Sequence, residues 1–450
     1  MDNQFTPNNT HLEDAKQYAS LDPHLKRLYR QPYIFHSDLL KKLPRKIPGI
    51  YTLGGGRQVG KSTLLKQWIE QLLKEGTCPE AIAFFSGELI RDYHHLYNLV
   101  QNQLSEMPRD QLKFLIIDEI TYIDDWDKTI KYLADLGEFE QVIIVLTGSD
   151  LVLMQDARKR FPGRRGMADV VDFHYYPLSF REYLILKKIH IPDEKFSQEM
   201  LIPINSAFEN YLVHGGFMTA INDHAANQTI SKATLTTYAD WIRGDFLKRK
   251  KNETFLMELL QATLKYQGSQ ISWDNLLKEL SIDHTQTVSD YMQLLSSMDA
   301  ITIQQAILED KLLPAPKKRK KILFNDPFIH HAVHAWLKNN DDPFTKQIKP
   351  TITDPETCAT LVEAVAISHY RRYYPTYYIK AKGEVDIAYV DNDTFWPIEI
   401  KWTSQIRSKD LTQVLKYPNG KIFAKTNTIR DIQGTPVYPL PLALAWLDAT

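Results

Sequence analysis

Residues 55–62 of the chain read Gly-Gly-Arg-Gln-Val-Gly-Lys-Ser, the most informative short motif in the sequence. They fit the pattern G-x-x-x-x-G-K-[ST], in which the glycines let successive backbone N–H groups point into one anion-binding hollow. A helix beginning near Lys61 adds its positive dipole end, while the Lys61 ammonium reaches the β- and γ-phosphates and the Ser62 hydroxyl binds Mg²⁺. The residues expected to hold a nucleotide are Gly55, Gly56, Arg57, Gln58, Val59, Gly60, Lys61, Ser62 and Thr63.

The residues around this loop alternate between short apolar runs and amphipathic segments. Residues 50–53 form an apolar run before the loop, and residues 64–73 carry apolar side chains at helical spacing after it. Further strands are predicted at 81–85, 114–117, 142–146 and 170–175, and further helices at 89–107 and 126–136. Strands separated by helices of this length predict an α/β fold with a mainly parallel sheet covered on both faces. This strand–helix context favours a P-loop NTPase over an ordinary glycine-rich turn.

Two carboxylates follow the predicted strand at residues 114–117. Asp118 and Glu119 come directly after four apolar residues, and a buried strand has little reason to end in paired acids unless a cation lies at its tip. Asp118 is expected to hold Mg²⁺ through water, and Glu119 to orient and deprotonate the attacking water. Taken alone, such a pair more often begins a solvated loop. The phosphate-binding loop favours the catalytic interpretation.

Polar and basic residues after the next predicted strand are further candidates for contact with the γ-phosphate. Residues 147–150 (TGSD) are positioned to sense the γ-phosphate, although Ser149 or Asp150 capping a helix is the alternative. Arg160, Arg164 and Arg165 cluster in a loop rich in glycine and proline. An arginine at the γ-phosphate speeds hydrolysis by orders of magnitude, and Arg164 is the candidate for this role. A solvated basic loop is the alternative.

The second half of the chain changes character after Pro177. Residues 205–224 and 230–250 are helical without strong strands, and 253–302 predict three helices. Within them, 272–280 and 285–298 have helix-turn-helix proportions, followed by a hairpin, or wing, at 300–305 and 320–324. Residues 339–352 are expected to be a linker, and one helix is expected at 358–370. The predicted domains are an N-terminal extension (1–30), a P-loop ATPase core (31–185), a helical lid-like region (186–250), a winged helix-turn-helix (251–338) and a C-terminal α/β domain (354–450).

Several motifs together resemble those of a known family. They are GGRQVGKSTLL, FLIIDEI, LTGSD, FPGRRG with YYPLSFREYL, YLVHGGF, GEVDIAYV and PIEIKW. From about residue 30 to residue 425 the chain is similar to archaeal and bacterial AAA-like P-loop ATPases that carry a C-terminal nuclease-like domain of unknown function. The resemblance implies an AAA-like ATPase core, a winged-helix middle and a C-terminal α/β domain of the restriction-endonuclease type, PD-(D/E)xK. It implies no settled biological role.

The C-terminal carboxylates also suggest a metal site by their spacing. Residues 384–390 and 398–401 alternate apolar and polar residues around a turn-forming stretch at 391–394. A turn centred between residues 392 and 393 would place Asp386 opposite Glu399, and Glu384 opposite Lys401. Two opposed carboxylates repel unless a cation lies between them. Asp386, Glu399 and Lys401 thus match the D…ExK pattern of Mg²⁺-dependent nucleases, with Glu363 as the matching helix acid.

The alternative for this hairpin is a solvated face without a metal ion. A Glu384–Lys401 ion pair, with help from Lys382, would then neutralise the acids, and Pro397 could shift the register. The domain would keep the fold without cutting nucleic acid.

Two basic runs suggest contact with DNA phosphates. Lys317–Lys321 are five consecutive basic residues expected at the wing tip, and residues 248–251 form another run. If the wing lay on the DNA backbone, the helix at 285–298 would enter the major groove. That helix, however, has no Lys or Arg. Winged helices also serve as protein-contact modules, and a lysine run can simply be solvated.

The composition excludes several broad classes of protein. Of the 450 residues, 54 are Lys or Arg and 55 are Asp or Glu, a formal net charge of −1, which excludes a histone-like protein that coats nucleic acid by bulk attraction. Cys78 and Cys358 have no CxxC partner, which excludes a disulfide framework and a cysteine-ligated zinc site. The N-terminal stretch is acidic and polar, and no apolar run approaches the ~20 residues of a membrane span. We expect a cytoplasmic protein without a membrane segment.

Three functional hypotheses follow from the sequence, and the weakest is a phosphotransferase that does not act on nucleic acid, because no obvious signature of a second-substrate pocket is present. The first is an ATPase that uses ATP and Mg²⁺, associates with DNA, and carries a possible Mg²⁺-dependent nuclease domain. The alternative is an ATP-dependent switch or scaffold with protein partners and an idle nuclease-like domain. A homo-oligomer is compatible with both.

Overall fold

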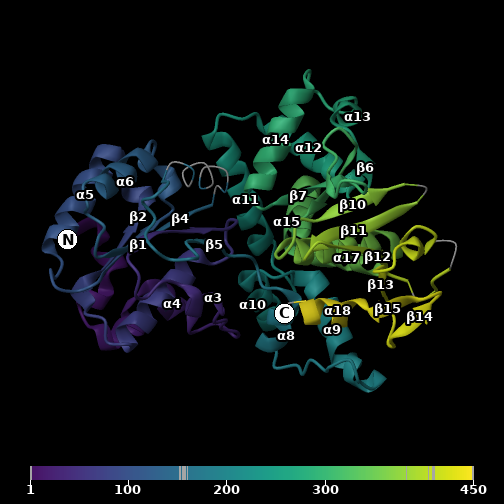
Figure 1. Cartoon of the computed structure of the whole chain (residues 1–450), viewed down its shortest axis with the longest axis horizontal. Helices are drawn as coiled ribbons and strands as arrows, with labels where there is room; N and C mark the ends of the chain where they lie inside the picture. Colours follow the sequence, from purple (N-terminus) through teal and green to yellow (C-terminus); the bar gives the residue numbers. More distant parts are fainter. Residues whose placement is uncertain are drawn as a thin grey trace. The chain divides into compact units, whose positions relative to one another are not determined.

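The computed structural model describes residues 3–149, 151, 154, 159, 161–381, 383–403, 405–407 and 411–447. The chain forms two compact units, Met1–Tyr176 and Pro177–Thr450, which Figure 1 shows in purple to teal and in teal to yellow. The first unit ends nine residues before the predicted boundary at residue 185. The segments predicted as a helical region, a winged helix and a C-terminal domain lie together in the second unit. No described helix is both long and apolar enough to cross a membrane.

The first unit is built on a five-stranded parallel sheet in the order β2-β3-β4-β1-β5, as the sequence predicts for a P-loop NTPase fold. The strands are β1 (Gly49–Gly54), β2 (Ile82–Ser86), β3 (Lys113–Asp118), β4 (Val142–Gly148) and β5 (Asp172–His174). The helices are α1 (Tyr18–Leu21), α2 (Pro23–Leu28), α3 (Leu39–Lys42), α4 (Lys61–Lys74), α5 (Tyr93–Glu106) and α6 (Trp126–Asp135). Short 3₁₀ turns lie at Asn3–Asn8, Thr10–Leu12, Ala15–Gln17, Pro79–Ala81, Gly87–Leu89 and Ile120–Tyr122.

Alternate residues of the sheet enter two separate hydrophobic cores. Leu115 and Ile117 of β3 pack with residues of α5 and α6, whereas Phe114 and Ile116 pack with residues of α4 and the N-terminal helices. Successive side chains of a strand point to opposite faces, so both faces of this sheet are covered by helices. The near-continuous apolar runs in the sequence reflect this double burial.

The predicted N-terminal extension is an integral part of the first unit. Phe5 is fully buried, and Asn9 pairs with the backbone of Phe84 on edge strand β2, donating to its carbonyl at 2.8 Å and accepting from its N–H at 2.7 Å. The buried Lys66 ammonium lies 2.9 Å from Asp22 and donates to the Asn8 carbonyl at 2.6 Å. The segment therefore closes an edge that would otherwise expose unpaired backbone groups.

The second unit contains a sheet in the order β14-β15-β13-β12-β11-β10-β7-β9-β6, with β8 paired to β7. The strands are β6 (Gln270–Ile271), β7 (Ile301–Leu308), β8 (Leu313–Pro314), β9 (Lys320–Phe324), β10 (Tyr377–Lys380), β11 (Glu384–Asp391), β12 (Thr394–Lys401), β13 (Lys421–Ala424), β14 (Arg430–Ile432) and β15 (Thr435–Pro439). The predicted hairpin is present, because β7 and β9 pair antiparallel. Strand β7 also pairs in parallel with β10, so one sheet joins the predicted winged-helix segment to the C-terminal segment.

The helices of the second unit include the predicted ones, add three that the sequence analysis did not name, at 180–186, 327–338 and 440–447, and differ from it at two further points. They are α8 (Phe180–Leu186), α9 (Gln198–His214), α10 (Met218–Asn227), α11 (Lys232–Lys248), α12 (Glu253–Tyr266), α13 (Trp273–Leu277), α14 (Thr285–Ser297), α15 (Pro327–Lys338), α16 (Lys349–Thr353), α17 (Pro355–Arg371) and α18 (Leu440–Leu447), with a π-helical turn at Phe344–Ile348. The prediction of a linker at 339–352 is wrong, because Phe344 and Ile348 are buried.

The second difference is a helix break at Gly215 and Gly216. The predicted helix at 205–224 is divided there into α9 and α10. Gly215 has φ +61°, and a Cβ at this position would collide with the Asp326 carboxylate, which accepts a hydrogen bond of 2.8 Å from the Gly216 N–H. Glycine is therefore required where the chain turns against Asp326.

Candidate functional site

The phosphate-binding loop connects β1 to α4 in the first unit. Gly60 has φ +101°, and Gln58 also lies in the left-handed region with φ +58°, so the loop turns sharply before Lys61 begins α4. A Cβ on Gly55 would collide with the Tyr175 carbonyl oxygen. Glycine is therefore required at residue 55 by the close approach of the chain after β5, and favoured at residue 60 by its left-handed backbone.

The Lys61 ammonium lies within the loop that it follows. It donates to the carbonyl oxygens of Gly55 and Gly56, each at 3.0 Å, and lies 3.3 Å from Glu119 Oε1. The Lys61 side chain is only 5% exposed. This position places a confined positive charge at the carboxyl end of β1, where the sequence predicts phosphate binding.

Ser62 and Asp118 come together at the same end of the sheet. The Ser62 hydroxyl donates to Asp118 Oδ2 at 2.5 Å, and Thr147 on the intervening strand β4 donates to Asp118 Oδ1 at 2.6 Å. Hydroxyl and carboxylate oxygens are the ligands that Mg²⁺ prefers, and Mg²⁺ is commonly held by one or two carboxylates together with substrate phosphates. Ser62 and Asp118 therefore fit a magnesium ion at this position.

Glu119 is held with its carboxylate directed toward Lys61. Its φ of +55° is left-handed, a conformation that costs a non-glycine residue on the order of 1–3 kcal/mol. Its N–H donates to the Thr147 hydroxyl at 2.8 Å, and its Oε2 accepts from the Ser149 N–H at 3.2 Å. Thr147 and Ser149, predicted as phosphate sensors or cap residues, thus orient the two carboxylates. Asp150 lies outside the described residues.

The surroundings shift the pKa values of the two carboxylates in opposite directions. Burial raises the pKa of Asp118, and the neighbouring Glu119 charge raises it further. Burial alone would raise the pKa of Glu119 as well, but the cations Lys61 and Arg57 and the hydrogen bonds from Lys61 and Ser149 lower it below its usual value. Glu119 is therefore ionised at neutral pH, as a residue that accepts a proton from water must be.

Arg57 and Tyr122 form an additional pair beside the loop. Arg57 is predicted only as a loop residue, but its guanidinium donates to the Tyr122 hydroxyl at 3.0 Å and lies 5.4 Å from the centre of that ring. It is 8% exposed. Tyr122 lies three residues beyond Glu119, and no sequence pattern singles it out.

Arg164 and Arg165, the described arginines of the 160–165 loop, lie away from the phosphate-binding loop. Arg164 pairs with Asp135, beside a hollow that is lined by Gly49 at the start of β1, whereas the phosphate-binding loop follows the other end of that strand. Arg165 pairs with Asp172 of β5 and donates to the Val171 carbonyl at 3.0 Å. The prediction that Arg164 contacts the γ-phosphate is therefore wrong for a nucleotide in the same chain, because the length of β1 separates them. Arg160 lies outside the described residues.

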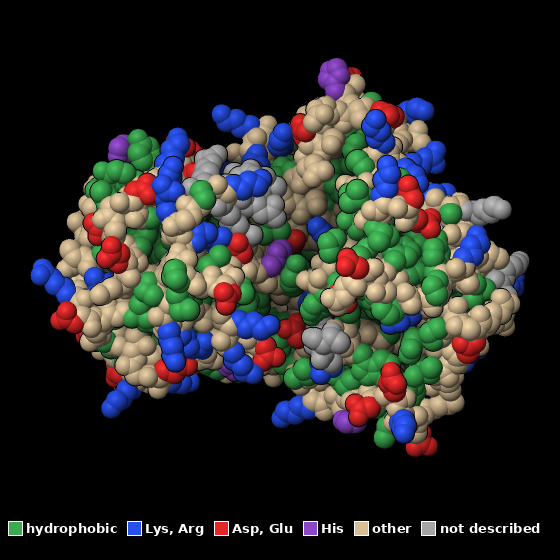
Figure 2. Space-filling view, viewed as in Figure 1, with side chains coloured by type: hydrophobic (Ala, Val, Ile, Leu, Met, Phe, Trp, Pro, Cys, Tyr) green, Lys and Arg blue, Asp and Glu red, His purple; other side chains and the backbone are tan. Residues whose placement is uncertain are grey.

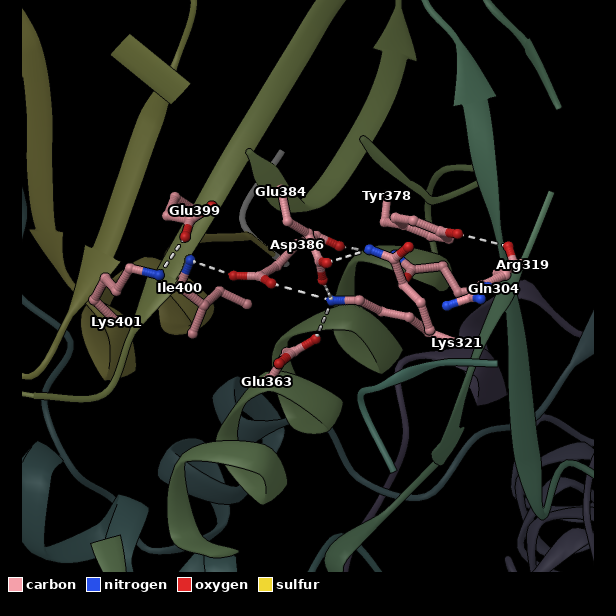
Figure 3. A network of polar contacts seen from close by, with 11 residues as sticks. Gln304, Arg319, Lys321, Glu363, Tyr378, Glu384, Asp386, Glu399, Ile400 and Lys401 are labelled. Carbon is pink, nitrogen blue, oxygen red and sulfur yellow. Dashed lines mark hydrogen bonds and ion pairs between the residues drawn. The ribbon is translucent and has the colours of Figure 1, made fainter. Parts of the chain in front are cut away.

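The predicted C-terminal site residues meet in the second unit, as Figure 3 shows. The hairpin register matches the prediction from Ile387 opposite Ile398 to Asp391 opposite Thr394, without a shift at Pro397. Asp386 accepts a 2.9 Å hydrogen bond from the Ile400 N–H, and Lys401 pairs with Glu399 rather than with Glu384. We call Glu363, Glu384, Asp386 and Glu399 the acid cluster. Lys382 lies outside the described residues.

A lysine that the sequence analysis assigned elsewhere lies within the acid cluster. Lys321 of β9 places its ammonium 2.8 Å from Glu363 Oε1 and 3.2 Å from Asp386 Oδ1, and also pairs with Glu384. Its side chain is 1% exposed. The prediction that Lys317–Lys321 all face DNA phosphates is therefore wrong for Lys321. A signal was present, because Lys321 directly precedes a buried apolar run at 322–324.

Burial and mutual repulsion control the protonation of the acid cluster. Burial and the Asp386 charge raise the pKa of Glu399 well above its usual value, and burial raises the pKa of Glu363 to about 7. Burial alone would lower the pKa of Lys321, but Glu363, Asp386 and Glu384 together raise it. Lys321 therefore stays charged.

The acid cluster does not fit the magnesium ion expected there. Among the described residues, no three His, Cys, Asp or Glu side chains are arranged to hold a metal ion. The Lys321 ammonium already lies between Glu363 and Asp386, two of the expected acids.

The remaining residues of the basic run at 317–321 are exposed or half-buried. Lys317, Lys318 and Arg319 are exposed, whereas Lys320 is half-buried and lies 5.4 Å from the centre of the Trp273 ring. On the face shown in Figure 2, Lys and Arg side chains are interspersed with Asp and Glu rather than gathered into one broad patch. Any electrostatic attraction for nucleic acid on this face would therefore be local.

Two parts of the chain match family models. Residues 48–184 match an AAA domain, and residues 205–342 match a domain of unknown function (DUF8612). An uncharacterised protein of Haemophilus influenzae is 29% identical over 188 residues, which are 40% of this chain and 42% of that protein. An uncharacterised protein of Methanocaldococcus jannaschii is 27% identical over 252 residues, which are 54% of this chain and 52% of that protein. The chain thus spans about half the length of the curated relatives that it matches.

Solved structures show weaker similarity. A Walker-type ATPase of Pyrococcus abyssi has a TM-score of 0.42 and 13% identity, covering 71% of this chain and 95% of that one. The ORC2 protein of Aeropyrum pernix, solved as ADPNP–ADP complexes, has a TM-score of 0.35 and 14% identity, covering 73% of this chain and 94% of that one. TM-scores below 0.5 do not define a shared fold for the whole chain. The match to the AAA model and the parallel sheet that carries the phosphate-binding loop together show that residues 48–184 have a P-loop NTPase fold.

Proposed function

We propose that this protein binds ATP in the loop at 55–62 and hydrolyses it in a Mg²⁺-dependent reaction. The observation that carries the proposal is the convergence of Lys61, Ser62, Asp118 and Glu119 at the carboxyl ends of β1 and β3. Lys61 balances phosphate charge, and Ser62 and Asp118 hold the metal ion. When bound, Mg²⁺ neutralises charge that develops on the phosphate oxygens. Glu119, held between Lys61 and the Ser149 N–H, orients the attacking water and accepts its proton.

Replacing Lys61 tests this proposal most directly. We expect Lys61→Ala to abolish ATP turnover and to weaken ATP binding, because the only described ammonium inside the loop is removed. The matched control is Lys74→Ala, since Lys74 lies on the same helix with its side chain 69% exposed. Phosphate release and calorimetric ATP titration are the measurements. Turnover by Lys61→Ala at the wild-type rate would refute the proposed site.

We further propose that the ATPase associates with DNA through Lys317, Lys318 and Arg319. These exposed residues follow β8 and precede β9, as the tip of a wing would. The Lys317→Ala/Lys318→Ala/Arg319→Ala variant is expected to lose low-salt binding to duplex DNA and any stimulation of ATP turnover by DNA. A substitution at exposed Lys311, which precedes β8 on the same connection, is the control.

The second candidate is an ATP-dependent switch that acts on protein partners. Two observations favour it. The exposed residues of α14 include Gln286, Asp290 and Gln293 but no Lys or Arg, and the acid cluster already holds Lys321. ATP turnover that is unchanged by DNA, together with no gel shift at low salt, would support this candidate over the DNA-associated ATPase.

A further inference from the structure

The acid cluster lies on three elements of the second unit. Glu363 is on α17, Glu384 and Asp386 are on β11, and Glu399 is on β12. Asp386 is 8% exposed and Glu399 is 4% exposed. Four carboxylates this close repel one another unless cations lie among them. Lys401 pairs with Glu399 at one side, which leaves the other three carboxylates to be neutralised.

Lys321, on a fourth element, contacts all three of those carboxylates and offsets one of their negative charges. Figure 3 shows its ammonium between Glu363 and Asp386, with Glu384 on the same side of the cluster. A lysine ammonium has three N–H donors, and here three carboxylates surround it. The aromatic ring of Tyr378 also packs beside the ammonium, with its centre 5.7 Å away. Each of the three N–H donors of the ammonium therefore has a carboxylate within reach to accept it.

The spacing of the oxygens also suits an ammonium rather than a small metal ion. Glu363 Oε1 and Asp386 Oδ1 lie 2.8 and 3.2 Å from the Lys321 nitrogen, which are ordinary lengths for charged hydrogen bonds. Magnesium binds oxygen at about 2.0–2.1 Å in near-ideal octahedral geometry. A magnesium ion could take this position only if the lysine left and the carboxylates moved inward.

The surrounding hydrogen bonds hold the acid cluster in this arrangement. Asp386 Oδ2 accepts from the Ile400 N–H at 2.9 Å, while Gln304 Nε2 donates to the Asp386 carbonyl oxygen at 2.9 Å. Gln304 lies directly opposite Lys321 in the β7–β9 pairing. The carboxylate and its cation are thus fixed by the same sheet.

We propose that the Lys321 ammonium is the resident cation of the acid cluster and takes the place of a divalent metal ion, so that the second unit neither needs nor binds Mg²⁺ there. A segment whose sequence carries the D…ExK pattern of metal-dependent nucleases is thereby stabilised without a metal ion. The inference does not depend on ATP hydrolysis in the first unit, because none of these residues belongs to that unit.

Counting bound Mn²⁺ by electron paramagnetic resonance tests the proposal in the full-length, nucleotide-free chain. In Lys321→Met, which keeps the length of the side chain but removes its charge, we expect one additional equivalent of bound Mn²⁺ relative to the wild type. The gain should disappear in Lys321→Met/Asp386→Asn, which lacks one of the carboxylates that the lysine contacts. Lys318→Met, at an exposed position of the same basic run, should match the wild type. A folded Lys321→Met variant without the gain would overturn the proposal.

A second comparison keeps the test decisive if Lys321→Met does not fold. Glu399 makes no contact with Lys321 among the described ion pairs, so Glu399→Gln leaves the three partners of the lysine intact. Wild type and Glu399→Gln are expected to bind equal amounts of Mn²⁺ and to leave plasmid DNA uncut in Mg²⁺. Wild-type Mn²⁺ binding that falls by one equivalent in Glu399→Gln would also overturn the proposal. ATP turnover, measured on the same samples, reports separately on the first unit.

Discussion

At the scale of single residues, Glu119 is the group on which the proposed chemistry depends. We expect Glu119→Gln to lower the rate of ATP turnover roughly 10²–10⁴-fold, because the amide keeps the shape of the side chain but cannot accept a proton. ATP affinity should stay within a few-fold of the wild type, since Lys61 and the loop amides are unchanged. Single-turnover phosphate release and calorimetry separate the two effects.

A neighbouring acid provides the control for Glu119. Glu88 is exposed beyond the end of β2, and Glu88→Gln should turn over ATP at the wild-type rate. If Glu119→Gln were as active as Glu88→Gln, the left-handed backbone at Glu119 would have a purely structural role, and the base would have to be sought elsewhere.

At the scale of elements, the N-terminal segment stabilises edge strand β2. Asn9→Ala removes both hydrogen bonds to the Phe84 backbone and leaves a buried N–H and a buried carbonyl without partners. We expect a loss of about 2 kcal/mol in the free energy of unfolding. Faster hydrogen exchange should be confined to the peptide that covers Ile82–Ser86, as measured by mass spectrometry. Asn3→Ala, at an exposed position of the same segment, should change neither quantity.

At the scale of the whole molecule, the two units have separate cores, and only the first contains the proposed nucleotide site. Calorimetric unfolding is expected to show two transitions. A ligand at about one hundred times its dissociation constant stabilises its unit by about 2.7 kcal/mol. A non-hydrolysable ATP analogue with Mg²⁺ should therefore raise one transition temperature by roughly 5–10 °C. An equal shift of both transitions would contradict independent unfolding.

Local sequence was sufficient for much of the first unit. The strand before Gly55, the helix after Gly60 and the paired acids after residue 117 are each encoded by neighbouring residues, through apolar periodicity and glycine chemistry. The hairpin of β11 and β12 was predictable for the same reason, because a turn at residues 392 and 393 determines which residues face each other. Such features depend on spacing along the chain, which a sequence displays directly.

Contacts between distant segments required the tertiary structure. Lys321 resembled its four basic neighbours until β9 placed it against carboxylates 42 and 65 residues away in sequence. Arg164 followed the nucleotide-site motifs in sequence, yet it lies beside the opposite end of β1. The sequence by itself determined the α/β class, the phosphate-binding loop and its two acids, because local geometry encodes them. Only the tertiary structure decided which cation neutralises the acid cluster, because that depends on which distant strands share a sheet.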